Sequence, residues 1–136
     1  MKKFLVIDGM ALIFRAFYAI RYEMTNKEGM PTNAVYGFTS MLLTALKNEK
    51  PEYTAIAFDL EGPTFRKEEF SDYKAQREKA PDELYMQIPL CKEMVRAFEI
   101  PAFEKPGFEA DDLIGTLTLH ASERGIFSMV LTGDMD

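Results

Sequence analysis

The chain has 136 residues, of which 47% are hydrophobic and 28% charged, and a formal net charge of -6 at pH 7. This length and composition are typical of an ordinary globular domain with its own core, and no apolar run approaches the ~20 residues that a membrane span requires. The negative charge by itself argues against nucleic acid as a partner, because phosphate binding depends on Lys and Arg, unless divalent metal ions take up several of the acids.

The cysteine content and the N-terminus indicate a cytoplasmic protein. Cys91 is the single cysteine, which excludes an intramolecular disulfide and fits a reducing compartment. It shares helical spacing with Ile88 and Val95, so we expect a core residue rather than a nucleophile. The first apolar run is interrupted by Asp8 and followed by Arg15, which excludes an export signal.

Short apolar runs alternate with helical patterns along the chain. In chain order, we predict a strand at 4–7, a helix at 11–22, a helix from Thr32 or Asn33 to about Asn48, a strand at 53–58, a helix from Pro81 to about Glu99 that Pro89 kinks or breaks, a loop or short edge strand at 101–106, a helix that follows Gly107 and ends at Gly125, and a strand at 127–131. The polar segment 61–80 receives no assignment.

This alternation predicts an α/β fold with three layers, in which flanking helices cover a central parallel sheet. The sequence contains no repeat, low-complexity segment or linker, so residues 1–136 are expected to form a single domain. Three parallel strands make a small sheet, and a new acidic motif opens at the last residues. We therefore expect the N-terminal part of a longer domain, truncated at the C-terminus.

Acidic residues follow each predicted strand. Asp8 comes after the first strand, Asp59 after the second, and Asp134 and Asp136 after the third. The carboxyl ends of parallel strands open at one edge of a sheet, where ligands bind in folds of this class. We therefore expect these four side chains to converge on one site.

The segment PGFEADDLIG adds three acids, Glu109, Asp111 and Asp112, in the first turn of the helix that follows Gly107. Two unit charges about 4 Å apart at an effective dielectric of ~20 repel by about 4 kcal/mol, so seven carboxylates at one rim need cations among them. All seven offer oxygen donors, which favours two Mg²⁺ or Mn²⁺ ions over zinc and predicts metal-assisted hydrolysis of a phosphate ester. The structural alternative, that these acids complement the helix dipole or occupy turns, explains each acid singly but not their shared placement.

A basic and aromatic segment follows Asp59 closely. Residues 64–79 interleave Arg66, Lys67, Lys74, Arg77 and Lys79 with Phe65, Phe70 and Tyr73. Cations that grip phosphates beside rings that stack on unpaired bases are typical of single-stranded nucleic-acid binding. A solvated charged helix is the alternative, because acids within the same segment offset much of the charge. Arg15 follows Asp8 within one helix and could also face the site.

A family resemblance that covers all 136 positions is carried by six motifs in chain order: IDGMALIFRAFYA, GMPTNAVYGF, FDLEGPTFR, YKAQR, PGFEADDLIGTL and TGDMD. Together they resemble the 5′ nuclease domain at the N-terminus of bacterial DNA polymerase I, in the flap-endonuclease group. The resemblance implies a PIN-like fold and a divalent-metal-dependent 5′-to-3′ exonuclease or flap endonuclease. It also implies hydrolysis of DNA and RNA primers in replication and repair, by a monomer that binds DNA with 5′ flaps or ends.

The resemblance also implies roles for individual residues. The first metal ion would be bound by Asp8, Asp59, Glu109 and Asp111, and the second by Asp134 and Asp136, with Asp112 nearby or acting through water. Arg66 and Lys74 match family positions at the base of a helical arch that contacts the scissile phosphate, so they are the expected catalytic cations. The expected DNA-binding residues are Phe14, where some relatives stack a base, with Arg15, Tyr73 and Arg77.

The chain departs from the family at two points. Met135 stands between the last two acids where the family usually has a basic residue, and the family's further metal-ligating Asp and helix-hairpin-helix-like element are absent from the 136 residues. We therefore expect weak or no nuclease activity from this chain alone. A nucleic-acid-binding module with an incomplete metal centre is one alternative. A haloacid-dehalogenase-like phosphatase with Asp59 as nucleophile is another, but the chain has Glu61 where that chemistry needs Asp.

Overall fold

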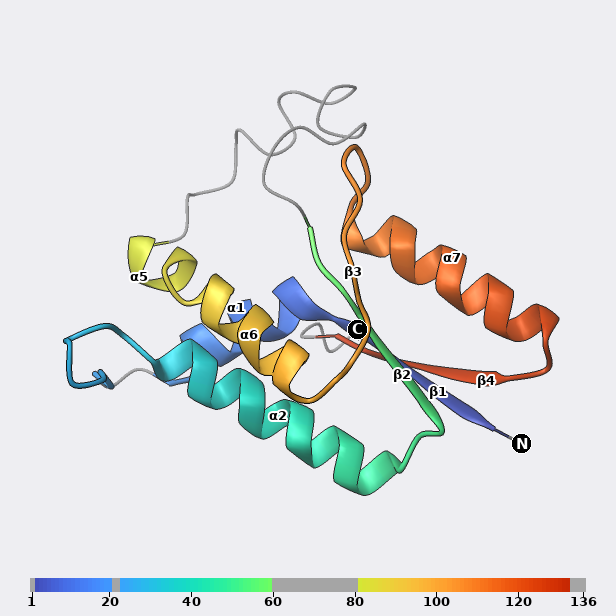
Figure 1. The fold of residues 1–136 in the computed structure, drawn as a ribbon, viewed down its shortest axis with the longest axis horizontal. Helices are drawn as coiled ribbons and strands as arrows, with labels where there is room; N and C mark the ends of the chain where they lie inside the picture. The colour runs from blue at the N-terminus through green and yellow to red at the C-terminus, as the bar shows by residue number, and fades with distance from the viewer. Residues whose placement is uncertain (1, 21–22, 60–80, 133–136) are drawn as a thin grey trace.

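The computed structural model describes residues 2–20, 23–59 and 81–132 (Figure 1). Its elements, in chain order, are β1 (Lys3–Asp8), α1 (Gly9–Ala19), α2 (Asn33–Glu49), β2 (Tyr53–Ala57), α5 (Asp82–Tyr85), α6 (Ile88–Ala97), β3 (Ala102–Phe103), α7 (Ala110–Glu123) and β4 (Phe127–Leu131). Strands and helices alternate as the sequence predicts, and the α/β fold class is confirmed. None of the described helices is long and apolar enough to cross a membrane.

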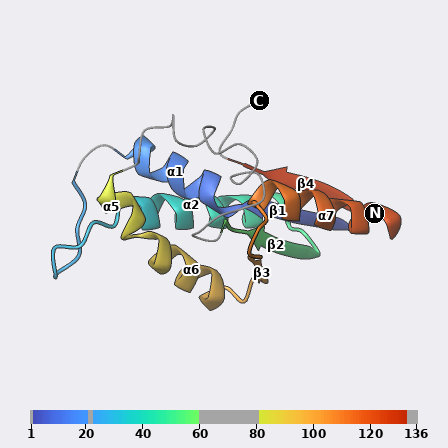
Figure 2. The ribbon, with the colours of Figure 1, turned by 90° about the horizontal axis from the view of Figure 1, so that it is seen from above.

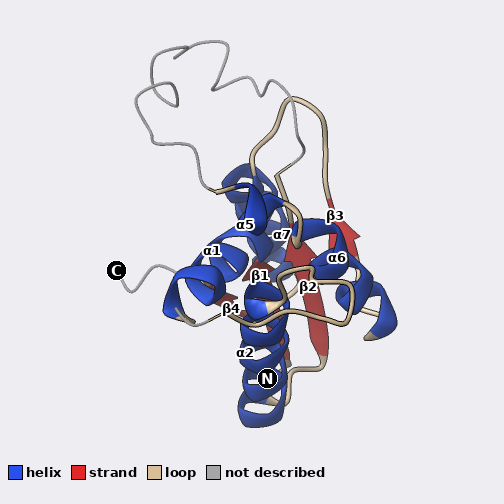
Figure 3. Cartoon of the chain, turned by 90° about the vertical axis from the view of Figure 1, so that its left-hand side faces the viewer, coloured by secondary structure: helices blue, strands red, loops and turns tan. Residues whose placement is uncertain are grey.

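The four described strands form one sheet in the order β3-β2-β1-β4 (Figure 2). Every pairing is parallel, and the register sets Asp8 opposite Ala57 on β2 and Ile7 opposite Leu131 on β4. The segment predicted as a loop or an edge strand contributes β3, a two-residue strand beside β2 (Figure 3). The sheet is therefore the predicted three strands with a short fourth at one edge.

One face of the sheet is covered by α1, α2 and α6 (Figure 1). This face holds most of the large buried side chains of the described residues, namely Leu5, Ile7, Ile56, Leu12, Ile13, Phe38, Leu42, Phe58, Leu84, Cys91 and Val95. The helices α1 and α2 pack closely because α2 has a glycine at their contact: a Cβ added at Gly37 would lie 2.8 Å from the Cβ of Ala16. Cys91 is buried in this layer, as predicted.

The other face of the sheet is covered by α7. Val6 and Ala57 pack there against Ala110 and Ile114 of the helix. Side chains alternate between the faces along a strand, so Val6 and Ile7 enter different layers. The three predicted layers are therefore present in the described part of the chain.

A buried glutamine joins three helices and replaces a predicted helix cap. The side chain of Gln87 is fully buried, and its Oε1 accepts hydrogen bonds from the backbone N–H groups of Ala34 at 2.7 Å and Val35 at 3.1 Å. Its Nε2 donates to Asn33 Oδ1 at 2.8 Å and to the Glu83 carbonyl at 3.0 Å. Thr32 stands at the N-cap position of α2, but its side chain makes no capping hydrogen bond. The expectation that Thr32 or Asn33 caps this helix through its own side chain is wrong, because Gln87 satisfies those N–H groups.

Two predicted helices have different bounds in the structure. The first begins at Gly9 rather than Ala11, because Asp8 accepts a hydrogen bond from the Ala11 N–H and acts as the N-cap. The helix predicted from Pro81 onward is broken into α5 and α6, and Pro89 lies in the first turn of α6. The break falls at Gln87, whose side chain is held by α2.

Candidate metal centre

Asp8 and Asp59 stand at the carboxyl ends of neighbouring strands and on the same side of the sheet. Asp8 ends β1, and Asp59 follows β2. The residues two positions before them, Val6 and Ala57, pack against α7. Because side chains alternate along extended backbone, both acids are directed to the α7 side.

The start of α7 is held against Asp59. Asp59 Oδ1 accepts a hydrogen bond of 2.6 Å from the backbone N–H of Ala110, the first residue of the helix. In addition, the Glu109 N–H donates to Asp112 Oδ2 at 2.9 Å, and the Glu109 side chain accepts from the Asp112 N–H, which completes a capping box. The first turn of α7, with its acids, is thereby fixed at the same edge as Asp8 and Asp59.

The pKa of the Asp8 carboxyl shows that its neighbours are close enough to affect it. Burial raises this pKa above its ordinary value of 3.8, and the hydrogen bond from the Ala11 N–H partly opposes the rise. The negative charges of Asp111 and Asp59 raise it further. Three acids from three separate parts of the chain therefore share one electrostatic environment, as the strand-end pattern predicts.

Within the described residues, no three Asp, Glu, His or Cys side chains gather closely enough to enclose a metal ion. The hydrogen bonds supply a physical reason, because Asp8, Asp59, Glu109 and Asp112 each turn a carboxylate oxygen toward a backbone N–H. The donor set still suits a hard divalent ion, since all its members offer oxygen. The acids share an edge, and their closer assembly around ions stays a prediction.

Several predicted site residues lie elsewhere or outside the described part. Six of them lie outside the described residues. These are the expected metal ligands Asp134 and Asp136, the expected catalytic cations Arg66 and Lys74, and the expected DNA-binding residues Tyr73 and Arg77. Phe14 is half-buried and packs against the core on the α1 side, whereas Arg15 is exposed on α1. Arg15 and Thr132 both line a cavity of about 450 Å³ between α2 and β4.

A family model described as "5'-3' exonuclease, N-terminal resolvase-like domain" matches residues 3–136. The chain belongs to this family. It is 44% identical over 134 residues to a DNA polymerase I of Caldicellulosiruptor bescii, a match that covers 98% of the chain and 16% of that relative. The chain spans 14–16% of the length of the first curated relatives that it matches.

Solved structures of the bacteriophage T5 nuclease share the fold of this 5′-3′ exonuclease domain. The T5 D15 protein co-crystallised with metal ions superposes with a TM-score of 0.74 at 16% identity, over 98% of this chain and 50% of the other. The T5 D15 flap endonuclease in a pseudo-enzyme-product complex with DNA and metal ions has a TM-score of 0.69 at 19% identity, over 98% and 50%. The resemblance inferred from the six motifs is confirmed, and so is the fold.

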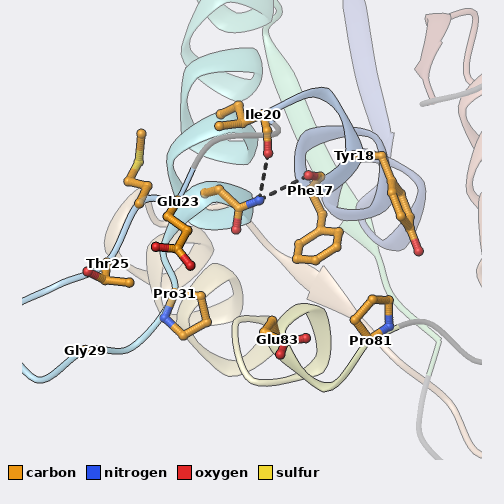
Figure 4. A pocket seen from close by; sticks show the side chains of 11 residues that line it. Phe17, Tyr18, Ile20, Glu23, Thr25, Gly29, Pro31, Pro81 and Glu83 are labelled. Carbon is orange, nitrogen blue, oxygen red and sulfur yellow. Dashed lines mark hydrogen bonds between the residues drawn. The ribbon is translucent and has the colours of Figure 1, made fainter.

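A cavity that sequence reasoning missed lies at the far end of α1 from the acids (Figure 4). Its volume is about 690 Å³, and its lining includes Phe17, Tyr18, Pro31, Pro81 and Glu83. Phe17, the first α1 residue in this lining, is nine positions after Asp8 in the sequence, which corresponds to about 13 Å along the helix at 1.5 Å per residue. The acidic edge of the sheet is therefore distinct from this cavity. No local pattern in the sequence predicts such a cavity, because segments that are distant along the chain form it together.

Proposed function

We propose that the chain carries the metal-binding part of a 5′-to-3′ exonuclease or flap endonuclease that hydrolyses phosphodiester bonds of DNA and RNA primers in replication and repair. The convergence of Asp8, Asp59 and the α7 acids at one sheet edge supports this most strongly, in a chain of the 5′-3′ exonuclease family. The T5 relatives of the same fold were crystallised with metal ions and, in one case, with DNA.

Two Mg²⁺ or Mn²⁺ ions would be bound by the acids at this edge. Asp8, Asp59, Glu109 and Asp111 would bind the first ion, and Asp134 and Asp136 the second, with Asp112 nearby or acting through water. When bound, such a pair of ions would supply the Lewis-acid chemistry that hydrolysis of a phosphodiester requires. The protein supplies the placement of the ligands, which come from the ends of three strands and from the start of one helix.

The hydrogen bond from the Ala110 N–H to Asp59 gives this placement its rigidity. It joins the end of β2 to the first residue of α7, two parts of the chain 51 positions apart. The capping box then fixes Glu109 and Asp112 on the first turn, so that Asp111 stays within electrostatic reach of Asp8. In this proposal α7 is the element that carries ligands to the strand ends.

The substrate contacts of the proposed nuclease come from cations and rings. Arg66 and Lys74 would contact the scissile phosphate, and Phe14, Arg15, Tyr73 and Arg77 would bind the DNA. Arg15 is exposed on the helix that starts at Asp8, which supports a role in phosphate binding. The partner would be DNA with a 5′ flap or end, bound by a cytoplasmic monomer.

A calorimetric titration of the chain with Mn²⁺, followed by a 5′-flap DNA in Mn²⁺ or in chelator, tests the proposal. We expect Mn²⁺ uptake that Asp111→Asn weakens and Glu93→Gln, an exposed acid on α6, leaves unchanged. We also expect weak or no cleavage by the 136-residue chain alone. Absence of any Mn²⁺ uptake would overturn the metal centre.

The rival function, a nucleic-acid-binding module, predicts a different result in the same titration. It would retain the flap in chelator and show the same affinity with Mn²⁺. A phosphatase would instead turn over p-nitrophenyl phosphate through a covalent intermediate on Asp59, but the family match assigns the chain to exonucleases.

A further inference from the structure

Gly9 lies directly after Asp8 and has no room for a side chain. A Cβ added there would lie 2.6 Å from Cδ1 and 2.9 Å from Cζ of Phe58, and closer still to Cε1. The glycine is buried as the first residue of α1. The backbone directly after Asp8 is therefore packed against the ring of Phe58.

Backbone conformation does not explain the glycine at this position. The glycines with positive φ in the described residues are Gly29, Gly107 and Gly125, and Gly9 is not among them. Alanine is a better helix former than glycine at a position with ordinary helical φ and ψ. The close approach of the Phe58 ring is thus the remaining physical reason for glycine here.

The Phe58 ring cannot easily move aside. Its side chain is fully buried, and its backbone N–H donates to the Phe103 carbonyl at 2.9 Å. The ammonium of Lys92 lies 5.3 Å from the ring centroid and forms an ion pair of 2.6 Å with Glu104. The backbone of Phe58 is thus bound to β3, and its buried ring lies beside a lysine of α6 that Glu104 holds in place.

We propose that Gly9 and Phe58 act as a positioning contact that sets the separation of Asp8 and Asp59. Each of the two contacting residues is the chain neighbour of one acid, Gly9 of Asp8 and Phe58 of Asp59. The ring therefore works as a spacer on the core side of the sheet, while the carboxylates lie on the α7 side. This inference rests on the proposed metal centre, whose ligands it would space.

Three glycine-to-alanine variants separate this role from ordinary packing. Gly9→Ala forces the ring and the strand ends apart. Gly37→Ala creates a similar clash with Ala16 but away from the acids, and Gly115→Ala on α7 meets no atom within 4 Å. Mn²⁺ affinity is measured by calorimetry and folding by urea denaturation for each variant.

We expect Gly9→Ala to weaken Mn²⁺ binding about tenfold, the usual scale for a residue that orients metal ligands. Gly37→Ala should lower the urea midpoint without changing Mn²⁺ affinity, and Gly115→Ala should change neither for the worse. Equal Mn²⁺ affinity for Gly9→Ala and the parent chain would overturn the proposal.

A compensating variant keeps the test decisive if Gly9→Ala folds poorly. In Gly9→Ala/Phe58→Val the side chain at 58 has no δ, ε or ζ atoms to meet the new methyl group, so folding and Mn²⁺ affinity should both return to the level of Phe58→Val alone. If Gly9→Ala lowers Mn²⁺ affinity as much beside Phe58→Val as it does in the parent chain, the two residues are not coupled and the spacing role is contradicted.

A metal-free readout distinguishes failure of this inference from failure of the metal centre. The Ala110 amide donates to Asp59 at 2.6 Å and lies 101 positions from Gly9 in the chain, so its NMR shift and exchange rate report where Asp59 sits. We expect both to change in Gly9→Ala and to stay unchanged in Gly37→Ala. If the parent chain takes up no Mn²⁺, this amide still decides whether Gly9 positions Asp59, and an unchanged amide in Gly9→Ala would refute it.

Discussion

The two faces of the sheet differ in what covers them and in what they carry. The face under α1, α2 and α6 buries large side chains such as Phe38 and Phe58, and its buried polar group, Gln87, has four hydrogen bonds. The face under α7 has a smaller cluster of buried residues, formed by Val6, Ala57, Ala110 and Ile114. At its rim the second face carries carboxylates from both strand ends and the helix start.

This difference separates the part of the molecule that stabilises the fold from the part that is suited to bind ions. Apolar burial on the first face favours folding, whereas three acids within electrostatic reach of one another oppose it on the second. A site of this kind can persist because the larger layer compensates for it. Substitutions on the two faces should therefore change different quantities.

The largest expected change in the free energy of unfolding comes from substitutions in the layer of α1, α2 and α6. Phe38→Ala removes a fully buried ring from α2 and should lower the free energy of unfolding by about 3–5 kcal/mol. Leu43→Ala, at a residue of the same helix that is 48% exposed, should cost less than about 1 kcal/mol. Urea denaturation measures both, and similar losses would contradict the burial assigned to α2.

The buried polar network of the same face should have the next largest effect. Gln87→Leu leaves the N–H groups of Ala34 and Val35 and the amide of Asn33 without their present partner, so we expect a loss of roughly 3 kcal/mol. Thr32→Ala is the matched control, because Thr32 makes no capping hydrogen bond, and it should cost less than about 0.5 kcal/mol. A larger loss for Thr32→Ala than for Gln87→Leu would show that α2 is capped locally.

Asp8, on the acidic face, should make the stability depend on pH in the opposite sense to most carboxylates. Because the pKa of Asp8 is raised in the folded state, its contribution to stability is largest below the unfolded value of 3.8 and is lost as pH rises through the folded pKa. Asp8→Asn keeps an N-cap for α1 and removes the charge, so the variant should be more stable than the parent at neutral pH without metal. The gain should shrink as the pH falls through the folded pKa toward 3.8 and should be largely absent below 3.8.

Added Mn²⁺ should reverse this order. An ion bound by the folded state alone stabilises it by about 2.7 kcal/mol at a concentration 100 times the dissociation constant. The parent should gain this stability and Asp8→Asn should gain less, which thermal denaturation with and without Mn²⁺ would measure. Equal gains in both proteins would remove Asp8 from the ligand set.

The smallest effect concerns Cys91, in the apolar layer. Burial raises the pKa of its thiol to about 12, so at pH 8 very little thiolate is present in the folded protein. Iodoacetamide should leave Cys91 unmodified in buffer and alkylate it in urea, as mass spectrometry would show. Rapid alkylation of the folded protein would mean that the α6 layer opens readily.

Local patterns in the sequence were enough to predict the strands, most of the helices and the edge shared by Asp8, Asp59 and the acids of α7. Strand-end acids such as Asp8 and Asp59 can be found from sequence because parallel strands present their carboxyl ends at one edge. The family followed from six motifs in order, and the family match confirms it. Three expectations stay predictions: that residues 1–136 form the N-terminal part of a single longer domain, the ligand roles of the acids, and the DNA contacts.

The tertiary structure alone decided how these parts meet. Gln87, at the break between α5 and α6, caps α2 from 53 positions away along the chain. The hydrogen bond from Ala110 to Asp59 likewise joins residues 51 positions apart. The need for glycine at position 9 likewise comes from the ring of Phe58, 49 positions away in the printed sequence. Local propensity and periodicity describe neighbours along the chain, whereas hydrogen-bond partners and close packing depend on which distant segments the fold brings into contact.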